Sequence, residues 1–264
     1  MTISVEEVIA VYSEESFQKM LRDVEGEIFR RLTETIESLF CDRDELKRVV
    51  IEHRIKSSDS LREKMKRKGY IDGWRLDDGF SRDYIACRLL ETVPDLIGIR
   101  LNCLFVEDEG DLLKGLLSSS CDSLSFEDDS TDTKVTKHRV YKLNGKYVVG
   151  ENAYRFEVQV KSYIDNLWGE VDHKRFYKSR GYVLQRPLVV ETMRQARSIL
   201  VATDQQLKAI YHSSVSEDDL LKGMFFEKTK DAVSEASGEQ LLGVHYESFY
   251  ELLLSSQHDN LYEA

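Results

Sequence analysis

The sequence predicts an α/β (α+β) protein, in which a mixed β-sheet is flanked by helices and helical extensions lie at both ends. Residues 154–161 alternate apolar and polar side chains, the period of a half-buried strand. Residues 97–105 are largely apolar on both faces, which is typical of a central strand. Helical periodicity surrounds both strands. We therefore expect N-terminal helices over residues 1–50, a core over 51–185 and a C-terminal helical extension over 186–264.

The composition limits the class of protein. The chain has 264 residues, of which 41% are hydrophobic and 32% are charged, and it contains no apolar run near the roughly 20 residues that span a bilayer. The first 20 residues lack the basic start and apolar core of a signal peptide. The four cysteines form no C-x-x-C pair, which fits reduced thiols better than disulfides or a zinc site. These features predict a cytoplasmic protein that does not contact membranes.

The charge distribution indicates what kind of ligand the protein binds. The net charge of -11 disfavours an extended nucleic-acid surface, because such surfaces are broadly basic. Residues 56–68 are nevertheless strongly basic, whereas residues 107–132 are strongly acidic. A local basic patch in an acidic chain favours a compact anion such as a nucleotide.

The first 70 residues supply packing helices and then a candidate phosphate site. Residues 5–50 have helical apolar periodicity, to which we assign no chemistry. Arg54 and Lys56 follow on one side of an extended piece. The run Ser57-Ser58-Asp59-Ser60 offers N-caps for a helix, and within it Ser60 and Glu63 have capping-box spacing. One face of that helix carries Ser60, Lys64 and Arg67. A helix N-terminus with converging cations suits phosphate oxygens, although a lysine-rich, solvent-exposed helix is the alternative.

The middle of the chain continues with a short helix over residues 84–90 and then the central strand. Asp95 lies just before that strand, and Gly98 within it would allow a close approach of ligand or backbone. Another helix is expected over residues 111–117. The acidic, serine-rich residues 118–136 are expected to form a mobile loop.

After the loop, two further elements are expected. Residues 139–147 predict a hairpin with Asn144-Gly145 as its turn. The alternating strand that follows carries four polar side chains on one face: Arg155, Glu157, Gln159 and Lys161. The subsequent helix has an apolar stripe (Ile164, Leu167, Trp168, Val171) and an opposite polar side (Asn166, Glu170, His173, Tyr177). An edge strand with a solvated face, followed by an ordinary amphipathic helix, is the alternative explanation.

Three segments taken together resemble the synthetase domain of the RelA/SpoT family, whose short members are the small alarmone synthetases. The segments are RIKSSDSLREKMKRKGY, DLIGIRLNCLFVED and FEVQVKSYIDNLWGEVDHKRFYK. The resemblance covers roughly residues 45 to 180. It implies a nucleotidyltransferase-like fold and a reaction that moves the β,γ-diphosphate of ATP to the 3′-hydroxyl of GDP or GTP.

The resemblance also implies roles for individual residues. Asp95 and Glu157 match the two carboxylates that hold Mg²⁺, and Glu157 matches the group that activates the acceptor hydroxyl. The positions that match ATP-binding residues are Arg54, Lys56, Ser60, Lys64, Arg67 and Arg100. The positions that match acceptor-binding residues are Gln159, Lys161, Asn166 and His173.

One motif departs from the family pattern. Relatives carry G-Y-R-S-x-H before the E-V-Q strand, and its tyrosine stacks on the acceptor guanine, whereas residues 132–147 read DTKVTKHRVYKLNGKY. Tyr141 and His138 are the available stand-ins.

Three hypotheses are consistent with this sequence. In the first, the protein transfers the diphosphate of ATP to GDP or GTP, and in the second it transfers it to an adenosine nucleotide or an RNA 3′ end. In the third, it is a non-catalytic nucleotide-binding regulatory protein on the same fold. The expected partners are ATP and a nucleotide acceptor, together with a second copy of the chain through the helical extensions.

Overall fold

The computed structural model describes residues 3–72, 74, 82–132, 139–150, 152–172 and 187–237. The helices are α1 (Val5–Tyr12), α2 (Glu15–Leu39), α3 (Asp44–Lys47), α4 (Ser58–Lys68), α5 (Arg82–Thr92), α6 (Asp108–Ser118), α7 (Tyr163–Asp172) and α8 (Pro187–Ser237). The strands are β1 (Val50–Ile55), β2 (Ile97–Cys103), β3 (Leu124–Asp128), β4 (Thr131–Asp132), β5 (Arg139–Val149) and β6 (Asn152–Ser162). The chain divides into two compact units, Met1–Asp204 and Gln205–Ala264.

The six strands form one mixed sheet, as the sequence predicts. The strand order is β1-β2-β6-β5-β3, with β4 paired to β5. The two predicted strands, β2 and β6, are adjacent and parallel, while β1, β5 and β3 join antiparallel to their neighbours. This arrangement places the central strand and the strand of alternating polar residues side by side.

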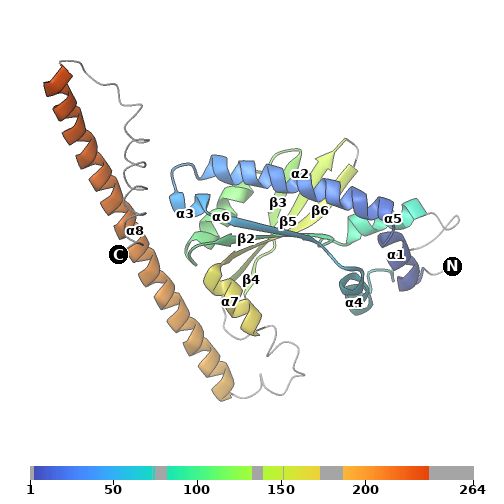
Figure 1. Cartoon of the computed structure of the whole chain (residues 1–264). Coiled ribbons are helices and arrows are strands. Elements are labelled where there is room, and N and C mark those ends of the chain that lie inside the picture. The colour runs from blue at the N-terminus through green and yellow to red at the C-terminus, as the bar shows by residue number, and fades with distance from the viewer. Residues whose placement is uncertain are drawn as a thin grey trace, which may run out of the picture. The chain divides into compact units, whose positions relative to one another are not determined.

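One face of this sheet is covered by helices (Figure 1). The side chains that point to it are apolar, and Ile99, Leu101, Phe156, Val158 and Leu143 are each no more than 2% exposed. They share one core with the buried side of α2 and with α6. Burial of this apolar surface is the main stabilising contribution in the first unit.

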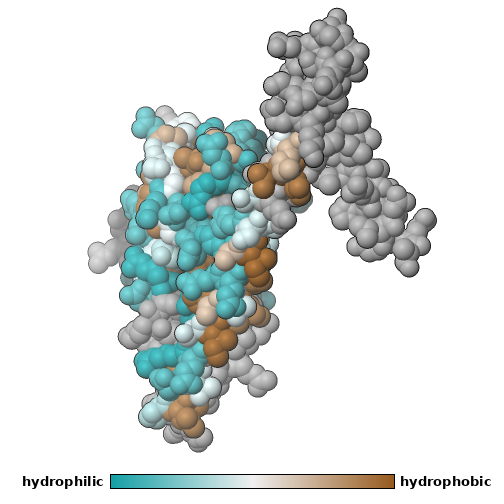
Figure 2. All heavy atoms as spheres, turned by 90° about the vertical axis from the view of Figure 1, so that its left-hand side faces the viewer, coloured by the Kyte–Doolittle hydropathy of each residue, from teal (hydrophilic) through white to brown (hydrophobic). Residues whose placement is uncertain are grey.

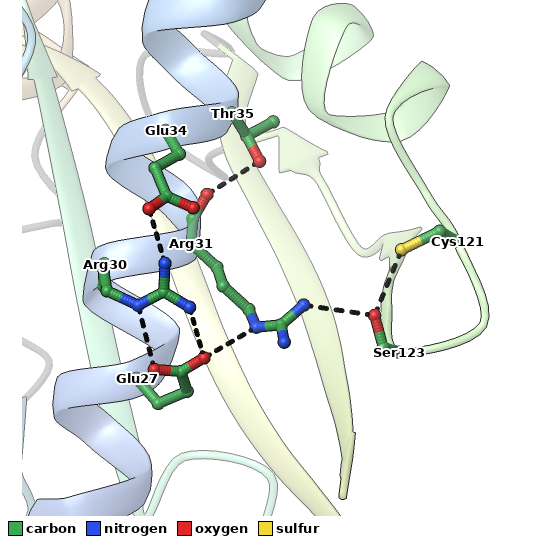
Figure 3. A network of polar contacts seen from close by, with 7 residues as sticks. All are labelled: Glu27, Arg30, Arg31, Glu34, Thr35, Cys121 and Ser123. Atoms are coloured by element: carbon green, nitrogen blue, oxygen red, sulfur yellow. Dashed lines mark hydrogen bonds and ion pairs between the residues drawn. The ribbon is translucent and has the colours of Figure 1, made fainter.

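Helix α2 is also linked to the far edge of the sheet by polar contacts (Figure 3). The Arg31 guanidinium donates to Glu27 within the helix at 2.9 Å and to the Ser123 hydroxyl at 3.3 Å. It lies over the Tyr147 ring, 5.3 Å from the ring centroid. Because Ser123 immediately precedes β3, these contacts fix the start of that strand against the helix.

Two expectations for residues 118–147 are wrong. The acidic segment expected to be a loop contains β3 and β4, and Asn144-Gly145 lies inside the continuous strand β5 rather than at a turn. Gly145 pairs with Phe156, and a Cβ at Gly145 would lie 2.2 Å from that ring. The glycine is therefore needed to make room for an aromatic ring across the strand pair. The actual turn contains Gly150, whose φ of +58° suits a tight hairpin connection.

Buried polar contacts attach the start of α8 to the first unit. Arg197 donates to Asp165 of α7 at 2.6 Å, and the Asp204 carboxylate accepts the Val106 backbone N–H at 2.9 Å. Exposed apolar residues also lie at intervals along α8 among polar ones (Figure 2): Leu188, Ile199, Leu207, Ile210, Leu220, Leu221 and Met224. In the described parts of the chain, none of the helices has the length and apolar character needed to cross a membrane.

Candidate active site

The second face of the sheet carries polar side chains. Residues that pair directly across neighbouring strands point to the same face, so Glu157 shares its face with Gly98 and Asn144. One step along, Gln159 pairs with Arg100 on one side and with Lys142 on the other. We call this surface the open face. It brings together predicted donor-side and acceptor-side residues from three strands.

Glu157 lies at the centre of the open face. Its Oε1 accepts a hydrogen bond from the Gln159 amide at 2.7 Å, and its Oε2 lies 2.9 Å from the Lys142 ammonium. The side chain is 15% exposed. Lys142 also contacts Asp129 at 2.8 Å. The carboxylate is therefore held by fixed donors while it remains accessible from solvent.

Two arginines lie beside Glu157. The Arg54 side chain lies against Gly98 of the neighbouring strand: a Cβ at Gly98 would be 3.6 Å from the Arg54 Nε. Arg100 donates to the Asn166 side chain at 3.2 Å and lies 3.5 Å from Glu52. The first of these contacts connects a predicted ATP-binding residue to a predicted acceptor-binding residue on α7.

These side chains line a cavity of about 160 Å³, whose walls are Glu52, His53, Arg54, Gly98, Ile99, Arg100, Glu157 and Gln159. This volume is smaller than the roughly 300–1,000 Å³ of enclosed ligand pockets. The cavity is therefore the floor of an open binding surface rather than a complete pocket. Its lining combines two guanidinium groups with carboxylates, which suits a phosphorylated ligand that carries a metal ion.

Asp95 occupies the turn before β2, together with two lysines from other elements. Its Oδ2 lies 2.8 Å from Lys56 Nζ and 2.7 Å from Lys64 Nζ, and all three side chains are 14–15% exposed. Burial by itself raises the pKa of Asp95, but the hydrogen bonds and charges of the two lysines outweigh it, so the pKa lies below its ordinary value. We call these three residues the Asp95 cluster. The structure thus brings together three residues that the sequence proposed separately.

Helix α4 starts within the expected serine-rich run, but not at the capping box. Its N-cap is Ser57, whose hydroxyl accepts the Ser60 backbone N–H at 3.3 Å, so the predicted capping box at Ser60 and Glu63 is wrong. The serine run offers several caps, and the first one after β1 is used, three residues before Ser60. Ser60 lies in the first turn, and Arg67 is exposed in the last turn.

Tyr141 does not join the open face. It pairs with Val160, whose side chain is buried in the core, and the Tyr141 hydroxyl lies 3.4 Å from where a Cβ on Gly110 of α6 would be. The ring therefore packs on the covered face, opposite Glu157 and Gln159. Its proposed role as the platform for an acceptor base is wrong, because strand alternation directs its side chain away from the site. His138 and His173 lie outside the described residues.

The remaining acceptor-side residues lie along the open face. Lys161 follows Gln159 on the same side of β6 and approaches α7, where a Cβ on Gly169 would lie 3.4 Å from its Nζ. Asn166 is held by Arg100 as described above.

One feature of the donor set suits a metal ion. Within the described part of the chain, the buried Oδ1 of Asp95 has no hydrogen-bond partner. A carboxylate oxygen left in this way is available to a hard cation. Among the described residues, no three histidine, cysteine or carboxylate side chains gather closely enough to form a metal site alone. A Mg²⁺ held here would need ligand phosphates as well, which is usual for this ion.

Sequence reasoning missed Lys142 and Glu52. Lys142 and Asn144 alternate with the apolar Tyr141 and Leu143, which is the pattern of a strand with one polar face. The assumed turn at Asn144-Gly145 interrupted that pattern. Glu52 lies on β1 opposite Arg100, a pairing that only the strand register reveals.

Comparisons with known proteins agree on the fold and the family region. Residues 53–182 match the family described as a region found in RelA/SpoT proteins. The chain is 27% identical over 139 residues to the GTP pyrophosphokinase YjbM of Bacillus subtilis, a match that covers 50% of this chain and 58% of that protein.

Two solved structures illustrate the likeness in three dimensions. One is small alarmone synthetase 1 from Bacillus subtilis bound to its product pppGpp, with a TM-score of 0.52 and 22% identity, covering 76% of this chain and 98% of that one. The other is a GTP pyrophosphokinase family protein from Streptococcus pneumoniae, with a TM-score of 0.54 and 18% identity, covering 79% and 98% respectively. At these identities the likeness establishes the fold.

Proposed function

The chain belongs to the RelA/SpoT family through residues 53–182, and from this premise we propose that it is a diphosphotransferase. The proposed reaction moves the β,γ-diphosphate of ATP to the 3′-hydroxyl of GDP or GTP and releases AMP. The observation that carries the proposal is the open face itself, where Glu157 lies among Arg54, Arg100, Gln159 and Lys142. The related synthetase 1 of Bacillus subtilis has been solved with the ATP analogue AMPCPP and with pppGpp, which supports nucleotides as the ligands.

The donor side is proposed to be the region around the Asp95 cluster. Lys56 and Lys64 are held there by Asp95, and Arg54 lies nearby on β1. Cations in fixed positions neutralise charge on a transferred phosphoryl group without reorganising during the reaction. Ser60 and Arg67 of α4 complete the proposed donor set, at a helix whose first turn suits phosphate oxygens.

Mg²⁺ is proposed as the cofactor, with Asp95 and Glu157 as its protein ligands. The free Oδ1 of Asp95 supports this assignment within the described chain. When bound, the ion supplies further neutralisation of the ATP phosphates. Glu157 pairs with Gly98 of β2, and Asp95 lies three residues before Gly98 in the turn that precedes this strand. A shared Mg²⁺ would require both side chains to reach toward the ion from these positions.

The chemical step follows from these positions. The acceptor 3′-oxygen attacks the β-phosphorus of ATP, the bond from that phosphorus to the α–β bridging oxygen breaks, and AMP leaves. Glu157 is proposed to accept the proton of the 3′-hydroxyl, which requires that one of its oxygens exchange Lys142 or Gln159 for the acceptor. Gln159, Lys161 and Asn166 lie along the open face where that acceptor would be bound.

A second candidate is the same donor chemistry on another acceptor. The observation that favours it is the position of Tyr141, which packs on the covered face and so, among the described residues, does not replace the family's stacking tyrosine. Hydrogen bonds to base edges decide base choice more strongly than stacking does. An adenosine nucleotide or an RNA 3′ end is therefore the alternative acceptor.

The test is transfer of label from ATP carrying a labelled β-phosphate to GDP, GTP, ADP and an RNA oligonucleotide. We expect label on the guanosine nucleotides with wild-type protein and about 10³-fold slower labelling with Glu157→Gln. Label on ADP or RNA alone would establish the second candidate. Binding of ATP without transfer to any acceptor would instead indicate a nucleotide-binding regulatory protein.

A further inference from the structure

Helix α7, which carries Asn166, is held more by polar contacts than by apolar packing. It has only 10 residues, and isolated helices shorter than about 12 residues are marginal in water, so its order depends on contacts with other elements. Among the residues of α7 whose side chains are described, only Asp165 and Trp168 are buried, whereas Tyr163 and Leu167 are 47% and 55% exposed. The position of α7 therefore depends on a small number of specific contacts.

Two hydrogen bonds fix the N-terminal end of α7. The Asp165 backbone N–H donates to the Ser162 hydroxyl at 3.1 Å, which is the bond that a helix N-cap makes. The Ser162 backbone N–H donates in turn to the Glu109 carboxylate of α6 at 2.6 Å. A helix that is held only at its first turn can still pivot there, so its direction must be set by contacts of its side chains.

One such contact comes from α8. The Arg197 guanidinium donates to Asp165 Oδ1 at 2.6 Å, and the two side chains are 15% and 6% exposed. Met193 and Asp204, four residues before Arg197 and seven after it, lie on the same face of α8 and are both buried. Asp204 accepts the Val106 backbone N–H, as described above. This part of α8 is therefore anchored independently of α7, and Arg197 offers α7 a fixed point.

The neighbouring residue of α7 meets the open face. Asn166 follows Asp165 directly, and its side chain accepts a hydrogen bond from Arg100 at 3.2 Å. Successive residues of a helix differ in direction by about 100°, so Asp165 can reach α8 while Asn166 reaches the sheet. Helix α7 is thus held between Arg197 and Arg100. A displacement of α7 at Asp165 is passed on to Asn166.

We propose that Arg197 is a positioning residue for the acceptor step, which holds α7 through Asp165 so that Asn166 faces the acceptor on the open face. The inference rests on the proposed function, because that function assigns the open face to an acceptor nucleotide. Arg197 itself contacts neither substrate. A largely buried ion pair suits this role, because its charge-assisted hydrogen bond is short and directional and because a displaced partner leaves a buried charge uncompensated.

The first experiment compares the KM and kcat values of Arg197→Met with those of the wild type, using the acceptor that takes the label. We expect the acceptor KM to rise about 10-fold, because a small misplacement of a binding group is costly. The KM for ATP should remain the same, since the Asp95 cluster is formed by other elements. A purely structural role would instead lower kcat with the folded fraction and leave both KM values unchanged. Arg197→Lys, which keeps the charge, should restore most of the acceptor KM.

The matched control is Arg30→Met, at an exposed arginine of α2 that pairs with Glu27 and Glu34. It removes an ion-paired arginine from a different helix and should leave both KM values unchanged. If Arg197→Met does not fold, Arg197→Gln combined with Asp165→Asn replaces the ion pair by two amides and leaves no unpaired charge at this contact. This double variant should show the same selective rise in the acceptor KM.

The second experiment needs no turnover. Hydrogen exchange of the backbone amides over residues 163–172 reports how firmly α7 is held, and α5 serves as the internal reference. We expect exchange over α7 to be about 10-fold faster in Arg197→Met than in the wild type, with no change over α5 and none in Arg30→Met. Equal exchange over α7 in a folded variant, or an unchanged acceptor KM, would overturn the role of Arg197. Absence of label transfer by the wild-type protein would overturn the proposed function instead, so the two failures can be told apart.

Discussion

The two faces of the sheet differ in chemistry although the same strands form both. On the covered face, Ile99, Val158 and Leu143 are no more than 2% exposed and pack beneath helices. On the open face, the neighbouring residues of the same strands are Arg100 and Glu157, which contact other polar side chains and line a cavity. Alternation along each strand therefore separates stability from ligand contact. Substitutions on the open face should change chemistry, and those on the covered face should change the free energy of unfolding.

The largest effect is expected on the open face. Glu157→Gln should reduce turnover about 10³-fold, because a positioned general base contributes about 10²–10⁴-fold to rate. The free energy of unfolding should change by less than about 1 kcal/mol, because Lys142 retains Asp129 and the substitution is not in the core. Steady-state kinetics and urea denaturation measure the two quantities. A loss of stability as large as the loss of activity would contradict the division between the faces.

Asp95→Asn should affect both activity and stability, because the Asp95 cluster lies at the end of the sheet and belongs to neither face alone. Removing the carboxylate leaves the largely buried Lys56 and Lys64 without their partner, which should cost about 3 kcal/mol of unfolding free energy in addition to activity. The pKa of Asp95 is lowered in the folded protein, so its contribution is present above the unfolded value of about 4 and is lost as pH falls through the folded value. Denaturation of wild type and variant at pH 7 and below pH 4 checks this. The difference between them should shrink at the lower pH.

A residue on the covered face should show the opposite behaviour. Tyr141→Ala should lower the free energy of unfolding by about 2 kcal/mol, since a half-buried aromatic ring that packs against α6 is lost. The KM for the acceptor should remain the same once the measurement is made well below the unfolding temperature. Tyr141→Phe is the matched control and should be nearly neutral. A selective rise in the acceptor KM would show that Tyr141 reaches the ligand after all.

A further effect, which depends on pH, concerns a titratable group that is buried on the helical side. Burial, together with the nearby charge of Asp165, raises the pKa of Glu109 to about 8, although hydrogen bonds from Ser162 and the charge of Arg197 oppose the rise. The folded protein therefore binds a proton more tightly than the unfolded chain between about pH 4.5 and 8, and stability must fall as pH rises through this window. The slope is at most about 1.4 kcal/mol per pH unit.

Glu109→Gln isolates this contribution. The amide oxygen can still accept the Ser162 backbone N–H, which Glu109 accepts at 2.6 Å, but it does not titrate. Denaturation at pH 6 and pH 8.5 should show a smaller decline for the variant than for wild type. Equal declines in both proteins would assign the pH dependence to other groups.

Local patterns were sufficient for several elements. The alternation in residues 154–161 predicted β6 and which of its side chains share a face, and the apolar run before Phe105 predicted β2. Both succeeded because the two-residue period of a strand is a property of neighbouring residues. The same approach failed at Asn144-Gly145, where a turn-like dipeptide belongs to a strand. The reason is the Phe156 ring, which requires a glycine opposite it and is 11 residues away in the sequence.

By itself, the sequence determined the family region, the strands at its centre and the candidate carboxylates Asp95 and Glu157. Only the tertiary structure decided their partners: Lys56 and Lys64 for Asp95, and Lys142 and Gln159 for Glu157. It also placed Tyr141 on the covered face. The reason is strand register, which sets which residues lie opposite each other across segments far apart in the chain and which no local pattern encodes.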